Sequence, residues 1–357
     1  MAESTSDAPL ESADAEPLRS LLRKTILTIA GRPWSGRDLV TAGTLSGRWP
    51  RLEEELSLGL ATLRDWTPPS SAVNAAVRDF RYAARLISAD EFSNWMHARE
   101  LSLAEVVASA QRQLARERQP QGVSVELPVK RAGAVAALPA EAICTGALKE
   151  IGTWLIDRVL SLEATSVSAQ PDAEIELLLQ RERTLLAATV LPESEASLRS
   201  RATLLLSADA TYQRRVAEAC SELAVAGAVR RHDLDWSAFE LASFPCPSIG
   251  AADEVAALLR EGTPLELISE PSGVRPELAE VRLEEAPKAI QGWLSGAHAG
   301  DVSGPVTDGD VHRVWLVQSR RTPDPHDPQV RQRARLEIIE AYMHPRRAGK
   351  VKWHERH

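Results

Sequence analysis

The spacing of apolar residues changes once along this 357-residue chain, near residue 231, and that change limits the folds it can adopt. Before it, apolar residues recur every three or four positions, as on one face of an amphipathic helix. After it, WSAFELASF (236–244) and VHRVWLVQS (311–319) alternate apolar with other residues, as strands do. The pattern predicts an α+β fold, in which a mainly helical region precedes a small α+β module. The predicted helices of the first region cover 18–30, 73–87, 139–162, 171–191 and 208–230.

Two helix starts in the first region are marked by capping residues. Ser88 with Glu91, and Ser102 with Glu105, have the spacing of a capping box. We therefore expect one short helix after each pair. Residues 118–138 interrupt the helical pattern, and VSVELPV in that stretch could form a short strand, although its proline disfavours one.

The region after residue 231 is punctuated by glycines and prolines. Helices are predicted over 251–262, ending at a glycine, and over 288–296, whereas 263–280 is expected to be irregular. A closing helix is predicted from Asp327 as its N-cap, with Pro328 at the first helical position.

Composition excludes several classes of protein. With 44% hydrophobic and 26% charged residues, the chain is typical of a globular protein. It has no run of about 20 apolar residues that could span a membrane. The acidic start, MAESTSDAPLESADAEP, lacks the apolar region of a secretory signal, so a cytoplasmic location is expected. The three cysteines and the terminal HERH have no convincing metal-ligand spacing, and we expect no metal and no cofactor.

Charge is unevenly distributed along the chain. The net charge is −8, yet the segment from Arg313 onward carries a local excess of six positive charges. A basic end can indicate a nucleic-acid partner. Cations in a C-terminal helix also suit the helix dipole, and the acidic remainder of the chain would repel a phosphate backbone. Nucleic acid is therefore not the expected partner.

The run SGAHAGDVSGPVTDGDVHRVWLVQSRR (295–321) resembles the end of a parvulin-type peptidyl-prolyl isomerase domain, most specifically at GDVSGPV (300–306) and His312. The layout of the chain is similar to the SurA and PpiC class of foldases, and ADEFSNWMHARELSLAE is similar to the chaperone region of that class. The resemblance implies four parts. These are a disordered tail (1–16), a helical chaperone-like domain (17–231), a degenerate parvulin-like domain (232–322), and a C-terminal helix with a basic tail that packs on the helical domain (323–357).

The resemblance also implies where a peptide would bind. His312 takes the place of the second histidine of parvulin active sites, and Ile290 that of a pocket phenylalanine. WSAFELASF supplies no first histidine, and VRPELAEVRLEEAP replaces the segment that carries the acidic or cysteine side of the site. We therefore assign no catalytic residue and interpret His312 as a remnant of the isomerase pair or, in preference to a catalytic role, as a strand histidine satisfied by a neighbour. The predicted peptide-binding residues are Phe239, Leu241, Ile290, Trp293, His312 and Trp315, of which the two tryptophans could instead be core.

The chain is similar to cytoplasmic, degenerate relatives of these foldases that accompany the maturation of ribosomal peptides, including the crocagin type of pathway. This implies a non-catalytic protein that holds a precursor or leader peptide for tailoring enzymes, by strand addition or in a cleft. The alternatives are an active prolyl isomerase or general cytoplasmic foldase, a nucleic-acid accessory that uses the basic end, and a structural scaffold.

Overall fold

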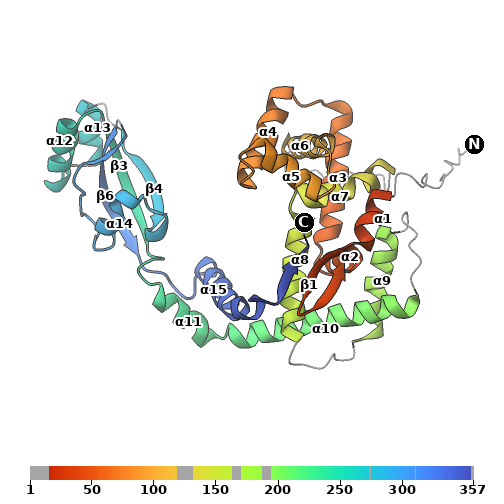
Figure 1. Cartoon of the computed structure of the whole chain (residues 1–357). Coiled ribbons are helices and arrows are strands. Elements are labelled where there is room, and N and C mark those ends of the chain that lie inside the picture. Colours follow the sequence, from red (N-terminus) through yellow and green to blue (C-terminus); the bar gives the residue numbers. More distant parts are fainter. Residues whose placement is uncertain are drawn as a thin grey trace, which may run out of the picture. The chain divides into compact units, whose positions relative to one another are not determined.

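The computed structural model describes residues 16–118, 132–162, 170–186, 194–272, 275–309 and 311–354. The chain forms two compact units (Figure 1): unit 1 is residues 1–216 with 343–357, and unit 2 is residues 217–342. The α+β class is confirmed, because each unit combines helices with a small antiparallel sheet. The predicted tail lies outside the described residues except for Glu16, and so does the predicted strand in VSVELPV.

Unit 1 is mainly helical. Its strands are β1 (Thr25–Ile29), β2 (Arg32–Ser35) and β7 (Val351–Trp353), in the antiparallel order β2-β1-β7. Its helices are α1 (Glu16–Arg23), α2 (Gly36–Leu45), α3 (Arg48–Asp65), α4 (Ser70–Ala83), α5 (Ala89–Ala98), α6 (Leu103–Arg118), α7 (Ala132–Cys144), α8 (Ala147–Leu162), α9 (Asp172–Leu186) and α10 (Glu195–Ala219).

The predicted helix over 18–30 is wrong from Thr25 onward. Helix α1 ends at Arg23, and the β-branched run that follows it forms strand β1. Ala30 and Gly31, with φ values of 49° and 81°, turn the chain into β2 as a two-residue hairpin does. The helical spacing in this stretch is coincidental, because β1 is stabilised by β7, a strand more than 300 residues away in sequence.

The two predicted capping boxes are confirmed. The side chain of Ser88 accepts from the backbone N–H of Glu91, whose carboxylate accepts from the backbone N–H of Ser88 at 2.8 Å. Ser102 and Glu105 make the same reciprocal pair. Helices α5 and α6 therefore begin where the sequence predicts.

The C-terminal residues of the chain pack on helix α8. Arg347 donates two hydrogen bonds to the carboxylate of Asp157, at 2.7 and 2.9 Å. The indole of Trp353 lies so close to Gly152 that a Cβ there would meet the ring at 2.1 Å. Strand β7 then completes the sheet beside β1, so the segment from residue 343 belongs to unit 1.

A buried ion pair joins α6 to α7. The side chain of Glu141 is fully buried and accepts hydrogen bonds from Arg112 at 2.8 Å and from Arg116 at 2.7 Å. Breaking such a pair by removing one partner leaves a buried charge uncompensated. Burial, and then the charge of Glu141, raise the pKa of the nearby Cys144 thiol to about 12.

Unit 2 contains a four-stranded antiparallel sheet in the order β4-β3-β6-β5. Its strands are β3 (Ala238–Cys246), β4 (Glu277–Arg282), β5 (Val306–Asp308) and β6 (Val311–Arg321). Its helices are α11 (Glu222–Arg231), α12 (Ile249–Arg260), α13 (Leu265–Ser272), the 3-10 turn η1 (Leu283–Glu285), α14 (Lys288–Leu294) and α15 (Pro328–Arg347), which ends in unit 1.

Most predicted elements of unit 2 are confirmed. Gly262, with a φ of 80°, follows the end of α12. Asp327 caps α15 by accepting from two backbone N–H groups of its first turn. The expectation that 263–280 is irregular is wrong, because it contains α13 and β4. The predicted helix over 208–230 is broken between α10 and α11, where Ser221 caps the second helix.

None of the described helices combines the length and the apolar character that crossing a membrane requires.

Replacing Gly36, the first residue of α2, should destabilise unit 1. A Cβ at this position would lie 2.1 Å from the carbonyl oxygen of Leu21, which is backbone and cannot rotate away. We expect Gly36→Ala to lower the free energy of unfolding by about 1–3 kcal/mol, as overpacking does. Urea unfolding followed by circular dichroism measures this. The control is Gly250→Ala in α12, where a Cβ meets nothing within 4 Å. Its stability should stay unchanged or rise by up to about 1 kcal/mol, and an equal loss in both variants would contradict the contact argument.

The Cys144 thiol should resist alkylation in the folded protein. With its pKa raised to about 12, it is almost entirely protonated at pH 8, and the thiolate is the reactive form. We expect iodoacetamide to modify Cys144 about 100-fold or more slowly than a free cysteine, until guanidinium unfolds the chain. The unfolded thiol ionises at a lower pH, so the stability that the protonated thiol contributes is lost as pH rises from about 9 through 12. Peptide mass spectrometry gives the rates, and labelling at the rate of a free thiol at pH 8 would contradict the assignment.

Candidate functional site

The central strands β3 and β6 carry a cluster of buried side chains on each face of the sheet, and the alternation of their side chains decides which residue lies on which face. Phe244 and Val314 pack with α12 and α13 on one face. Phe239, Trp315 and Val317 pack on the other face, together with η1 and α14. Because α14 has only seven residues, it covers part of this second face.

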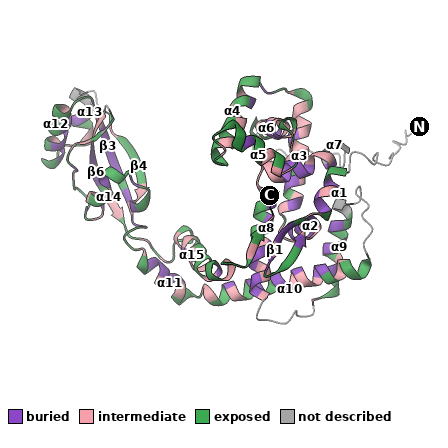
Figure 2. Cartoon of the chain, in the orientation of Figure 1, coloured by how far each residue is buried: buried purple, intermediate pink, exposed green. Residues whose placement is uncertain are grey.

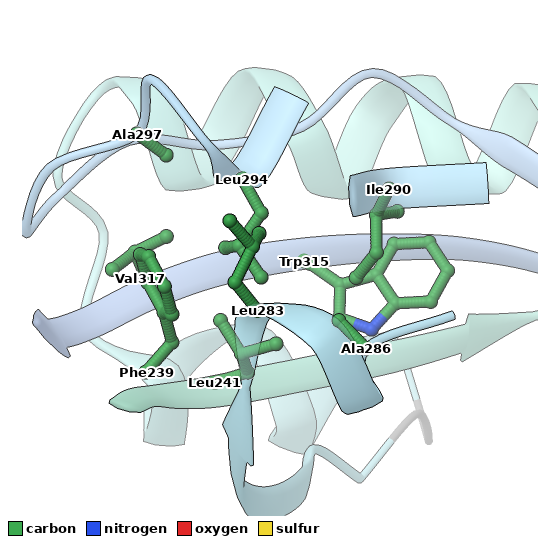
Figure 3. Close-up of a cluster of buried hydrophobic side chains, with 9 residues drawn as sticks. All are labelled: Phe239, Leu241, Leu283, Ala286, Ile290, Leu294, Ala297, Trp315 and Val317. Atoms are coloured by element: carbon green, nitrogen blue, oxygen red, sulfur yellow. The ribbon is translucent and has the colours of Figure 1, made fainter. Parts of the chain in front are cut away.

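A cluster of buried side chains lies between α14 and the sheet (Figure 3). The indole of Trp315 lies beside Ile290 of α14 and Ala286, and Leu241 of β3 lies along the same surface. Phe239 and Ile290 have no exposed surface, whereas Leu241 and Trp315 keep 3% and 6%. The cluster consists of Phe239, Leu241, Leu283, Ala286, Ile290, Leu294, Ala297, Trp315 and Val317.

An open pocket continues this cluster past the first turn of α14. It has a volume of about 520 Å³, within the range of pockets that hold small ligands. Every strand of the sheet contributes to it, as does the start of α14. Leu241 and Trp315 connect it to the cluster beneath. The lining residues are Leu241, Ser243, Glu277, Ala279, Val281, Pro287, Lys288, Ala289, Val306, Thr307, Arg313 and Trp315.

The polar part of the pocket is arranged around Arg313. Its Nη1 donates to Glu277 Oε2 at 2.6 Å and to Ser243 Oγ at 3.2 Å, so the arginine of β6 reaches across β3 toward β4. The side chain of Arg313 is 27% exposed and that of Glu277 is 60% exposed. Lys288, the first residue of α14, is exposed and makes no hydrogen bond or ion pair with the described part of the chain.

Strand β4 forms one edge of the sheet beside the pocket. It pairs with β3, and no other described strand pairs with it. Four of its six residues are exposed, and its ribbon carries the colour of exposed residues in Figure 2. Glu277, Ala279 and Val281 line the pocket, and the residues between them point to the opposite face. The main chain of this edge strand can therefore pair with another segment.

The structure places the predicted peptide-binding residues at three depths. Leu241 and Trp315 line the pocket. Phe239 and Ile290 lie in the buried cluster, and Trp293 packs half-buried against it.

His312 lies on the other face of the sheet. It is opposite Cys246 in the strand register and two residues before Val314, both of which belong to the α12 side. Its Nδ1 and Thr307 Oγ1 are 3.0 Å apart, so its ring has a hydrogen-bond partner. Burial raises the pKa of the Cys246 thiol, so this cysteine is not an activated nucleophile.

The motif at 300–306 has a structural task in this fold. Ser303, 3% exposed, accepts from the backbone N–H of Trp315 through its hydroxyl and donates its own N–H to the Trp315 carbonyl. Gly300, with a φ of 91°, donates to the carbonyl of Val317. The segment thereby holds the outer side of β6, next to β5, and keeps Trp315 in its place at the pocket.

Sequence reasoning missed the polar residues of the pocket and the pocket side of β4. Glu277 and Ala279 escaped because β4 has no apolar alternation and was expected to be irregular. Ser243 and Arg313 lie in predicted strands, on the same face as Leu241 and Trp315, so strand alternation could have found them. Lys288 had no comparable signal, because only the tertiary structure shows that α14 begins at the pocket.

The described residues contain no cluster of three or more side chains that could hold a metal ion. His354 of the terminal HERH is 2.9 Å from Thr28 Oγ1, and Glu355 and His357 lie outside the described residues.

No protein-family model matches the chain, and no curated protein matches it. Solved structures that are similar include the peptidylprolyl isomerase PrsA of Bacillus anthracis, which is 15% identical, with 52% of this chain and 86% of that chain covered and a TM-score of 0.21. PrsA of Bacillus cereus is 12% identical, with coverages of 58% and 84% and a TM-score of 0.26. A SurA-like chaperone of Campylobacter jejuni is 13% identical, with coverages of 57% and 88% and a TM-score of 0.18. With TM-scores this low, the function has to be argued from this chain's own residues.

The buried and the open residues of the site should respond differently to substitution. Ile290 is fully buried against Trp315, so Ile290→Ala should lower the free energy of unfolding of unit 2 by about 2–5 kcal/mol. Lys288 is exposed and has no partner in the described part of the chain, so Lys288→Ala should change it by no more than about 0.5 kcal/mol. Urea unfolding of both variants tests the assignment, and a large loss in Lys288→Ala would show that this residue is structural.

Proposed function

We propose that unit 2 is a non-catalytic peptide-binding module that holds an extended segment at the pocket beside β4. The observation that carries the proposal is an apolar-walled pocket that opens next to β4, an edge of the sheet with which no second described strand pairs. Each feature alone is common in proteins. Together they supply the two requirements of extended-peptide recognition, which are main-chain pairing and a place for an alternate side chain.

The pocket wall suits an apolar side chain of a bound segment. Ile290 packs against Trp315, and Ser303 hydrogen-bonds the backbone of Trp315, so the indole of Trp315 forms a rigid surface. Val281 and Ala279 of β4 and Val306 of β5 extend this surface on both sides. Rigid aromatic surfaces bind with little loss of conformational entropy, which is why they are common anchor points in interfaces.

The edge of β4 suits the main chain of the same segment. A peptide that pairs with β4 places every second side chain on the face that Ala279 and Val281 occupy. Those side chains then lie over the pocket. This geometry supports recognition by strand addition, in which main-chain hydrogen bonds provide affinity and the pocket provides selectivity.

The ionisable groups of the pocket support holding rather than catalysis. They are Glu277, Lys288 and Arg313, and the first and last of these neutralise one another at 2.6 Å. His312, which the sequence assigned as a remnant of an isomerase pair, faces α12 and hydrogen-bonds Thr307. Prolyl isomerisation is a rotation about the peptide bond with a barrier of about 18–20 kcal/mol, and the one predicted remnant of an isomerase site, His312, lies on the other face of the sheet from the pocket.

The segment that we propose as the natural ligand is part of a ribosomally made precursor, such as its leader. The module would hold it in the cytoplasm while tailoring enzymes modify the rest of the peptide. This step rests on the resemblance of 295–321 and of the chain layout to degenerate foldases that accompany peptide maturation.

Filling the pocket should abolish peptide binding without unfolding the protein. We expect Ala279→Trp, on the exposed pocket side of β4, to weaken binding of extended Leu- or Trp-containing peptides by about tenfold or more. Fluorescence anisotropy with labelled peptides measures the Kd. The matched control is Leu278→Trp, one residue away on the opposite face and 66% exposed, which should leave the Kd unchanged.

Equal weakening by both variants, or by neither, would place the peptide elsewhere. A protease-coupled prolyl isomerase assay completes the test. Acceleration by the wild type that is lost in His312→Ala would overturn the non-catalytic assignment.

A further inference from the structure

We infer that the pocket selects segments in which a carboxylate side chain lies beside the apolar anchor side chain, and that Lys288 is the residue that binds this carboxylate. The inference rests on the proposed function and names the class of peptide that the pocket takes.

The first step is the charge of the pocket. Its lining includes two cations, Lys288 and Arg313, and one anion, Glu277. Since Glu277 and Arg313 form an ion pair, one positive charge remains, and it belongs to Lys288. An exposed ammonium with no partner among the described residues has three donors available to a ligand.

The second step is the hydrogen-bonding capacity that Arg313 retains. Only its Nη1 donates to described residues, while a guanidinium carries five N–H donors on three nitrogens. Nε and Nη2 make no hydrogen bond to the described part of the chain. Glu277 has one oxygen in the pair, and its other oxygen lies on a 60% exposed side chain that water reaches. The unused groups of the pocket are thus mainly donors.

The carboxylate must also lie close enough to Lys288 while the anchor side chain occupies the pocket wall. In an extended segment, residues two positions apart lie on the same face and are separated by about 6–7 Å, and both Lys288 and Trp315 line the pocket. A Glu or Asp two positions from the anchor can therefore meet Lys288 while the apolar side chain occupies the wall. A lysine at the same position would meet an uncompensated like charge.

The local preference of the pocket for a carboxylate is opposite to the long-range electrostatic effect of the whole chain. The chain has a net charge of −8, which by itself favours basic peptides. A preference for acidic neighbours therefore has to originate in the pocket. It should weaken as salt screens the contact.

The experiment uses the full-length protein and three labelled decapeptides of Gly and Ser. Each contains one central Trp with Glu, Gln or Lys two positions away on both sides, so that these side chains share the pocket face with the Trp. We expect the wild type to bind the Glu peptide about three- to tenfold more tightly than the Lys peptide, with the Gln peptide between them. Lys288→Glu should reverse this order. Arg335→Glu, the same charge change at an exposed position of α15 outside the pocket, should leave it unchanged.

The outcomes distinguish this inference from the proposed function. Reversal by Lys288→Glu alone supports the assignment. Equal affinities for all three peptides that Ala279→Trp weakens in parallel would overturn the charge selectivity and leave the peptide site in place. Absence of binding to every peptide, or binding that Ala279→Trp does not change, would overturn the peptide site itself and the selectivity with it.

Discussion

The antiparallel pairing of β3 with β6 is the constraint on which unit 2 depends. These central strands are apolar on both faces, so each must be covered on two sides. Helices α12 and α13 cover one face and α14 with η1 covers part of the other. The register also decides which residues line the pocket, because residues one position apart lie on opposite faces. Trp315 consequently walls the pocket, while Val314 belongs to a separate core.

The pocket exists because the cover of the second face is incomplete. A seven-residue helix is shorter than the strands it packs on, and the uncovered surface is lined by apolar residues, among them Trp315, and by the Glu277–Arg313 pair. In this pair the two charges neutralise one another at the edge of an apolar surface, and the pocket stays open. Lys288 is the first residue of α14, and it is exposed at the pocket where the cover ends.

Unit 1 depends on contacts between distant parts of the chain. Strand β1 is held by β7, and the bidentate Arg347–Asp157 contact holds the segment that carries β7. The buried Glu141 with Arg112 and Arg116 joins α6 to α7. Removing one partner of such a buried pair leaves the other charge uncompensated, which is strongly destabilising.

The sequence by itself determined the local structure of this protein. Capping boxes, the glycine after α12, the aspartate before α15 and the alternation in β3 and β6 are signals carried by neighbouring residues, and each identifies an element correctly. Only the tertiary structure decided the rest. Strand β1 depends on its pairing with β7, and β4 on its pairing with β3. A strand without apolar alternation is stabilised by main-chain pairing, and the periodicity of the local sequence does not reveal that pairing. The place where the cover by the short helix α14 ends on the sheet decides which residues are core, namely Phe239 and Ile290, and which form the pocket rim, namely Glu277, Lys288 and Arg313. The sequence pattern cannot predict that place, because it depends on how the helix packs on the sheet.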